Sequence, residues 1–244
     1  MRYLLTIRYL GTNYHGWQVQ ENAVAVQPLV QQALTELFPH GPGVSGCSRT
    51  DSGVHANMYC FHFDSDLEYS PHGVICSVNR NLPDDIAAYD CKVVDEEFHA
   101  RYSVTSKEYE YVIYNGKYRS PMWENRAYYY RFPLNVEAMN QAAQQFVGTY
   151  DFTSFCAQGA KEGDKTRTVY SAQVVRQGDL VIFRVSANGF LYNMVRIMMG
   201  TLLRVSQGKI TPEQIPQIIE QKNRNAAGPT APAQGLYLNQ VFYE

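Results

Sequence analysis

The sequence lacks the features that mark several large classes of protein. No apolar run is long enough to cross a membrane, and the N-terminal residues alternate and include Arg8, which suits a strand better than a secretion signal. Hydrophobic residues make up 45% of the chain and charged residues 18%, a balance typical of globular rather than disordered proteins. We therefore expect a globular fold with a sizeable core and no membrane segment.

Motifs for common cofactors and for hydrolysis are missing as well. No glycine-rich run precedes a helix with the spacing of a nucleotide-binding loop, so neither ATP nor a nicotinamide cofactor is indicated. No Gly-x-Ser-x-Gly nucleophile motif is present. The 5 cysteines are widely spaced without a Cys-x-x-Cys pair, which argues against a zinc site and predicts reduced thiols in the cytoplasm.

An excess of positive charge is also absent. The net charge is −2, whereas proteins that bind nucleic acids usually present a basic surface. A local basic surface is still compatible with that total. The 19 tyrosines offer flat faces for unpaired bases, although many of them also suit half-buried strand positions. Composition alone neither establishes nor excludes RNA as a ligand.

Strand and helix patterns follow one another along the whole chain. Alternation predicts strands over residues 2–10, 57–63, 86–94, 109–113, 170–176, 180–185 and 236–243, and helical spacing predicts helices over 28–37, 71–80, 136–146, 194–205 and 213–222. Gln177-Gly178-Asp179 is typical of a hairpin turn. No low-complexity linker separates the halves, so we expect two packed α+β domains, residues 1–103 and 104–244, that meet at a cleft.

One segment, Arg49-Thr50-Asp51-Ser52-Gly53, places a carboxylate between a nearby cation and a flexible Ser-Gly pair. It comes just before an alternating strand, so the carboxylate can be held rigidly at a cleft. The same residues also suit an ordinary turn, because Asp bonds its own backbone and Gly accepts a positive φ. The segment by itself leaves both interpretations open.

A metal site is another hypothesis for this region. His55, His62, Asp64 and Asp66 lie close together in the sequence. Alternation places the last three on one strand face without the spacing of a His-x-x-x-His site. We therefore expect a solvated strand face and no metal.

Several motifs occur in order from one end of the chain to the other. They are Gly16-Trp17-Gln18, Arg49-Thr50-Asp51 with Gly53-Val54-His55-Ala56, Asp151-Phe152-Thr153-Ser154-Phe155, Arg167-Thr168, Phe190-Leu191 with Met194-Val195-Arg196, Gly200-Thr201-Leu202-Leu203 and Gly235-Leu236-Tyr237-Leu238. With this set the chain resembles the tRNA pseudouridine synthase A family over essentially its whole length. Each motif is weak evidence alone, and their order carries the resemblance.

The resemblance implies an isomerase that converts uridine to pseudouridine at nucleotides 38, 39 and 40 of the tRNA anticodon stem-loop. It implies no cofactor and no metal. The implied fold is α+β, with two halves of ferredoxin-like, RRM-like topology joined through a central, mostly antiparallel sheet. It also implies a homodimer whose protomers both contact tRNA.

The chemistry explains why the site needs a carboxylate. Moving uracil from an N1 to a C5 linkage requires the glycosidic bond to break and the base to turn before it is rejoined, and a carboxylate can hold one fragment covalently. Asp51 matches the family's nucleophile, which would attack either ribose C1′ or uracil C6. Arg196 matches its partner, which lowers the carboxyl pKa and orients the group. Arg49 matches the residue that fills the space left by the extruded nucleotide.

Aromatic and apolar residues complete the implied site. Tyr109 matches the active-site tyrosine, which stacks on the base and can take the C5 proton. Phe190 and Leu191 would form walls of the pocket. Without the resemblance, Tyr109 suits the core and Arg196 suits a surface position on a helix. Arg101 suits a phosphate contact and a solvated charge equally well.

Two other functions compete with the synthase. A non-catalytic RNA-binding α+β module would use tyrosine platforms, but a carboxylate that repels phosphate has no use there. A metal-assisted hydrolase built on His55 and His62 would require bound metal. We favour the synthase, with catalytic residues Asp51, Tyr109 and Arg196 and substrate-binding residues Arg49, Tyr109, Phe190 and Leu191.

Overall fold

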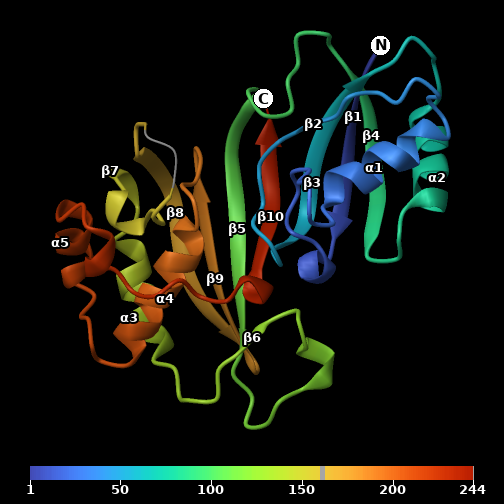
Figure 1. Ribbon diagram of the computed structural model, residues 1–244. Helices are drawn as coiled ribbons and strands as arrows, with labels where there is room; N and C mark the ends of the chain where they lie inside the picture. Colours follow the sequence, from blue (N-terminus) through green and yellow to red (C-terminus); the bar gives the residue numbers. More distant parts are fainter. Residues whose placement is uncertain (160–162, 244) are drawn as a thin grey trace. The chain divides into compact units, whose positions relative to one another are not determined.

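The computed structural model describes residues 1–159 and 163–243 and divides into two compact units. Unit 1 contains Met1–Thr105 and the chain from Leu238 onward, and unit 2 contains Ser106–Tyr237. Figure 1 follows the chain by colour from its N-terminus to its C-terminus. The chain leaves unit 1 close to the predicted division, and its closing strand groups with unit 1.

Unit 1 combines a sheet with two α-helices. Its strands are β1 (Arg2–Tyr9), β2 (Ser45–Gly46), β3 (His55–Asp64), β4 (Ile86–Val94) and most of β10 (Leu236–Tyr243), in the order β4-β1-β3-β10 with β2 beside β3. Its helices are α1 (Val26–Thr35) and α2 (Pro71–Asn81), and the 3-10 turn η1 (Gly11–Asn13) follows β1. Strand β1 pairs antiparallel with both β3 and β4.

Aromatic packing fixes the register of the central strands of unit 1. Tyr3 of β1 is paired with Phe63 of β3, and their rings stack at 5.3 Å between centroids. Phe38, in the turn after α1, meets both rings. A slip of one residue would turn each ring to the opposite face of the sheet, so this buried cluster determines the pairing. In Figure 1, α1 and α2 lie side by side against this sheet.

Local sequence explains where the two helices begin. Helix α2 begins at Pro71, as predicted, because Ser70 accepts a hydrogen bond from Gly73 N at 3.1 Å and proline suits the first turn. Helix α1 begins at Val26, earlier than the predicted start at Pro28. The first N–H groups of a helix have no partner inside it, so a proline there breaks no bond and does not mark the first residue.

Unit 2 has the same mixture of elements. Its strands are most of β5 (Val104–Tyr114), β6 (Tyr128–Tyr129), β7 (Gly148–Asp151), β8 (Thr166–Gln177) and β9 (Leu180–Ala187), in the order β5-β9-β8-β7 with β6 parallel to β5. Its helices are α3 (Val136–Gln144), α4 (Met194–Ser206) and α5 (Gln214–Glu220), and its 3-10 turns are η2 (Pro121–Trp123), η3 (Thr153–Phe155), η4 (Arg224–Ala226) and η5 (Ala233–Gly235). The predicted hairpin is confirmed, since Gln177 of β8 pairs with Leu180 of β9.

Helix α4 is buried on nearly every side, and on one of them the chain at residues 228–229 crosses it in backbone contact. A Cβ atom at Gly200 would come within 1.7 Å of the Pro229 carbonyl oxygen. Next to it, Thr201 accepts a hydrogen bond from Gly228 N at 2.8 Å. Only glycine permits this approach. The crossing segment continues to Ala231, whose N–H donates to the Arg196 carbonyl at 3.0 Å and so holds the first turn of the helix.

The predicted α+β class with mostly antiparallel pairing is confirmed. In unit 1, β1 pairs antiparallel with its neighbours, and in unit 2 the pairs β5–β9, β8–β9 and β7–β8 are antiparallel. The cleft between the halves stays a prediction, as do the domain limits 1–103 and 104–244. Within residues 1–159 and 163–243, no helix is both long and apolar enough to cross a membrane.

The prediction of a solvated strand face at His62 is wrong. Asp64 is exposed and pairs with Arg2 at 2.8 Å, but the His62 side chain is buried. Its Nδ1 accepts a hydrogen bond from Ala100 N at 3.1 Å, and the His99 ring packs on it at 4.6 Å. Residues far along the chain thus cover this position. Burial lowers the pKa of His62 to about 4, and the neighbouring His99 and Arg2 add to this effect while Asp64 opposes it.

We expect the stability of the protein to fall in acid because of His62. Its pKa is lower in the folded state than the ordinary value near 6.5, so the unfolded state binds more protons between about pH 6.5 and pH 4. The free energy of unfolding should therefore decrease over that window, by roughly 1–3 kcal/mol from this residue. Urea unfolding at several pH values should show a weaker decrease for His62→Asn. The exposed His40→Asn is the control, and an unchanged pH dependence in His62→Asn would contradict this assignment.

Candidate active site

The loop that carries Asp51 is anchored in the unit 1 sheet at both ends. It leaves β2, which pairs with β3 through Ser45 and His62, and it returns directly into β3. Cys47 N donates to the Cys60 carbonyl at 2.8 Å, which extends this pairing into the loop. Both ends of the loop therefore share one rigid support.

Two tyrosines of the sheet form hydrogen bonds with the loop. The hydroxyls of Tyr9 and Thr50 are 2.9 Å apart, and this bond is buried. Tyr59 donates a hydrogen bond to the Ser48 carbonyl. Asp51 lies between these anchored positions and the strand, is half-buried, and accepts a bond from Val54 N at 3.2 Å through its carbonyl. The turn interpretation and the held-carboxylate interpretation of this segment are thus compatible.

A second loop, between β1 and α1, packs on the Asp51 loop backbone to backbone. Gly16 has φ +82°, and a Cβ atom there would lie 2.1 Å from the Thr50 carbonyl oxygen. Gly53 N donates to the Tyr14 carbonyl at 3.1 Å, which ties the two loops together. Trp17 stacks on Tyr59 at 4.1 Å between centroids. The Gly16-Trp17-Gln18 motif therefore supports the Asp51 loop.

His55 has a structural contact in the same region. It is fully buried, and its Nδ1 accepts a hydrogen bond from Gly11 N at 2.9 Å. His62 Nδ1 is used in the same way by Ala100 N. Among the described residues, no three His, Cys, Asp or Glu side chains gather as a metal site would require.

Arg49 is exposed and lines a pocket of about 270 Å³ in unit 1. Gln18, His99, Arg101 and Tyr102 also line it. From the sequence, Arg49 is a predicted substrate contact, Arg101 suits a phosphate contact or a solvated charge, and neither His99 nor Tyr102 has a predicted role. No local pattern distinguishes those two residues, because they follow β4 and reach the pocket only through the fold.

In unit 2, Tyr109 and Phe190 lie together. Tyr109 is on β5, paired with Val185 of β9, and is 7% exposed. Its ring meets the Phe190 ring at 5.0 Å and 82°, an edge-to-face contact. Phe190 and Leu191, both half-buried, lie between β9 and α4, and the Leu191 carbonyl accepts from Met194 N at 3.0 Å. The short connection thus places these three predicted residues close to the start of α4.

The guanidinium of Arg196 is held in place at the first turn of α4. Its Nε donates to the Ala231 carbonyl at 2.7 Å, and its Nη1 donates to Asn193 Oδ1 at 2.7 Å. Asn193 itself has φ +59° at the N-cap position. The side chain is half-buried, in contrast to the snorkelling surface cation that the helix pattern alone suggested.

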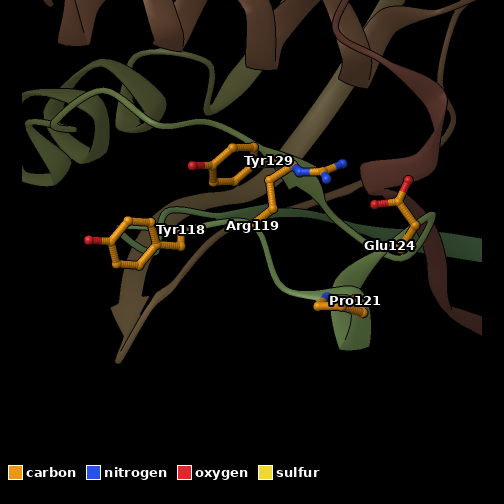
Figure 2. A pocket seen from close by; sticks show the side chains of 5 residues that line it. All are labelled: Tyr118, Arg119, Pro121, Glu124 and Tyr129. Carbon is orange, nitrogen blue, oxygen red and sulfur yellow. The ribbon is translucent and has the colours of Figure 1, made fainter.

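A larger pocket, of about 660 Å³, lies on the segment between β5 and α3 in unit 2. Figure 2 shows Tyr118 and Tyr129 on one side of it and Glu124 on the other, with Arg119 between them. None of the predicted site residues lines it, and its carboxylate is exposed. The predicted site residues instead lie on the Asp51 loop of unit 1 and, in unit 2, at the Tyr109–Phe190 contact and on the first turn of α4. That these two halves form one site stays a prediction.

Comparisons with known proteins agree on one family. A family model described as tRNA pseudouridine synthase matches residues 142–244. The chain is 48% identical over 240 residues to the tRNA pseudouridine synthase A of Ruminiclostridium cellulolyticum, covering 98% of each chain. It is 43% identical over 239 residues to the protein of the same name from Acetivibrio thermocellus and 42% identical over 240 residues to that of Thermoanaerobacter sp., again with 98% of each chain covered. The chain belongs to the tRNA pseudouridine synthase A family.

Proposed function

We propose that this protein converts uridine to pseudouridine at nucleotides 38, 39 and 40 of the tRNA anticodon stem-loop, with Asp51 as the nucleophile. Its family membership supports the reaction and the substrate class. The observation that carries the role of Asp51 is the backbone contact of Gly16 with Thr50, which fixes the loop on which the carboxylate stands. A covalent catalyst needs such fixed geometry, because a displacement of about 1 Å can cost roughly 100-fold in rate.

The proposed reaction is an isomerisation, so it balances without a cofactor. The N1–C1′ bond breaks, the uracil turns, a C5–C1′ bond forms, C5 loses its proton, and N1 gains one. The Asp51 carboxylate attacks either C1′, which releases the base, or C6, which makes the ring a covalent adduct. In both routes the carboxylate is ionised before the attack and is released at the end.

Arg196 keeps that carboxylate ionised in the proposed mechanism. A cation within a few ångströms lowers the pKa of a carboxyl group and aligns it by hydrogen bonding. The bonds of Arg196 to Asn193 and Ala231 support this role, because they fix the cation before substrate arrives.

In this proposal three residues contact the extruded base, and Arg49 fills the space that the base leaves in the RNA stem. The edge-to-face contact of Tyr109 and Phe190 offers a ring on which the extruded uracil stacks, and Leu191 closes the wall. The Tyr109 hydroxyl takes the C5 proton. Arg49, which is exposed, enters the stem-loop in place of the target and offsets part of the few kcal/mol that extrusion costs.

We place this activity in the cytoplasm, carried out by a homodimer with tRNA as its nucleic-acid partner. All 5 cysteines are free thiols, which agrees with a reducing compartment. An RNA as large as tRNA exceeds one small site, so contacts from both protomers would enlarge the surface that holds it.

Replacing Asp51 separates catalysis from binding. Asp51→Asn should lower pseudouridine formation on an anticodon stem-loop transcript by at least about 1,000-fold, because the amide cannot attack. Its affinity for the transcript should stay within about twofold, since a carboxylate contributes nothing favourable to phosphate binding. Chemical mapping of pseudouridine and fluorescence anisotropy measure the two effects.

The exposed Asp66→Asn is the control and should match wild type in both assays. Full turnover by Asp51→Asn would contradict the nucleophile assignment. A wild-type protein that binds the transcript without modifying it would instead favour the non-catalytic RNA-binding module.

Replacing Gly16 tests the support of the loop. Gly16→Ala places a methyl group against the Thr50 carbonyl and should lower the turnover rate by about 10- to 100-fold, through displacement of Asp51. Gly41 is a matched control, since it also has a positive φ, +61°, but its nearest contact would be an ordinary 3.5 Å. Gly41→Ala should cost about 1 kcal/mol of stability and leave turnover unchanged. Equal turnover in the two variants would refute the role of Gly16.

A further inference from the structure

The pocket beside Arg49 lies entirely within unit 1. Its volume is about 270 Å³, which is close to the lower end of the roughly 300–1,000 Å³ of small-molecule sites and suits a single nucleotide. It is formed by the start of the Asp51 loop, by the loop before α1 and by the turn after β4. The residues that line it are Trp17, Gln18, Gln27, Val44, Ser45, Gly46, Ser48, Arg49, His99, Arg101 and Tyr102.

The charge of this pocket is opposite to that of the whole protein. Arg49 and Arg101 line it together with the imidazole of His99, and no carboxylate is among its described lining residues. The chain as a whole has a net charge of −2. Guanidinium groups without a nearby acid attract an anion, and phosphate is the anion whose geometry they match best.

A rigid turn presents Arg101 and Tyr102 to the pocket. Ser103 N donates to the His99 carbonyl at 2.9 Å, and the Ser103 hydroxyl accepts from His99 N at 3.0 Å. His99 Nδ1 accepts from Arg101 N at 3.1 Å, and its ring packs on the buried His62. The turn is closed from both ends, so the backbone that carries the two exposed side chains is fixed before a ligand arrives.

Tyr102 forms an open aromatic platform beside this cation. Its side chain is 76% exposed, a high value for a tyrosine on a well-anchored turn. The Arg101 guanidinium lies 5.7 Å from the centre of its ring, and the His99 ring lies at 4.4 Å. An exposed ring next to a guanidinium is the combination that unpaired bases use, with the base stacked and its phosphate paired.

Amide groups form another wall of the pocket. Gln18 Nε2 donates to Gln27 Oε1 at 3.0 Å, so the two amides hold each other in fixed orientations. Such amides donate to and accept from the edges of bases and the 2′-hydroxyl of ribose. The pocket therefore offers a cation for phosphate, a ring for a base and amides for the sugar or base edge.

We propose that this pocket binds one RNA nucleotide next to the target uridine, with its phosphate on Arg101 and its base on Tyr102. The inference rests on the proposed function, because it takes tRNA as the ligand. It adds a substrate-binding subsite made by the turn after β4. Arg49 lies at the edge of both this subsite and the Asp51 loop, so the tests use Arg101 and Tyr102.

The first test is the salt dependence of binding. Full-length wild type and Arg101→Ala are titrated with a fluorescent anticodon stem-loop transcript at salt concentrations from about 50 to 300 mM. Arg101→Ala should weaken binding about 3- to 10-fold and reduce the slope of log K against log salt by about 0.7–0.9, the loss of one phosphate contact. Arg80→Ala, an exposed arginine of unit 1 outside the pocket, should change neither. An unchanged slope for Arg101→Ala overturns the phosphate contact.

The second test separates base stacking from general attraction to anions. Tyr102→Ala should weaken binding of the transcript by at least about fivefold, and Tyr102→Phe should restore it, because the ring alone stacks. Heparin carries anionic groups without bases, so its binding should depend on Arg101 and not on Tyr102. Equal effects of Tyr102→Ala on heparin and RNA would overturn the nucleotide assignment and leave a simple anion site.

These outcomes are distinct from a failure of the proposed function. If wild type forms pseudouridine and the Arg101 and Tyr102 variants bind like wild type, only the subsite is wrong. If wild type neither binds nor modifies the transcript, the proposed function fails first. Far-ultraviolet circular dichroism of each variant checks that the exposed substitutions leave the fold intact.

Discussion

One contact, the backbone approach of Gly16 to Thr50, fixes the loop that carries the proposed nucleophile. It joins the loop after β1 to the loop before β3, and any side chain at Gly16 would occupy the space of the Thr50 carbonyl oxygen. The hydroxyl pair of Tyr9 and Thr50 holds the same residue from the sheet. Asp51 follows Thr50 directly, so its position is set by the core of unit 1. A carboxylate on a mobile loop would lose the orientation that nucleophilic attack requires.

In unit 2, the packing of one helix also positions the Arg196 guanidinium. Arg196 stands on the first turn of a helix that residues 228–229 cross about one turn later, at Gly200. The same crossing segment supplies the Ala231 carbonyl that receives the Arg196 side chain. The apolar packing of α4 therefore also determines where a positive charge lies. Two segments that are far apart in the sequence, the start of α4 and residues 228–231, thus serve one structural purpose.

The proposed subsite would allow a protein of slightly negative charge to bind RNA. Electrostatic attraction depends on the local potential at the ligand, and an acid-free pocket with two guanidinium groups provides it. The acidic residues elsewhere on the chain can then favour solubility without opposing the binding of RNA at this pocket. Rings such as Tyr102 add stacking, which does not depend on net charge.

Most elements were predictable because local chemistry sets them. Strand β4 has its predicted bounds, and α2 begins where Ser70 and Pro71 indicate. Strands β2, β6 and β7 were not predicted, since β2 and β6 have only two residues and β7 has four, too few for a clear periodicity. The burial of His62 was also missed, because residues after β4 cover it and no local pattern records such a contact.

The candidate site divides in the same way. The family resemblance leads to Asp51, Tyr109 and Arg196, since local patterns alone favour a core position for Tyr109 and a surface position for Arg196. The contact of Tyr109 with Phe190 places two of the predicted residues together. The roles proposed for Gly16 and Tyr102 depend on contacts in the folded protein. The motif marks Gly16 without showing that it meets Thr50, and no local pattern shows that Tyr102 lines a pocket.

The most direct test of the central claim is the distance between the Asp51 carboxylate and the Arg196 guanidinium in a crystal structure of the protein bound to an anticodon stem-loop. The account predicts a hydrogen-bonded pair at about 3 Å, beside C1′ or C6 of an extruded uridine. A carboxylate directed into bulk solvent, away from any guanidinium and from the uridine, would contradict it.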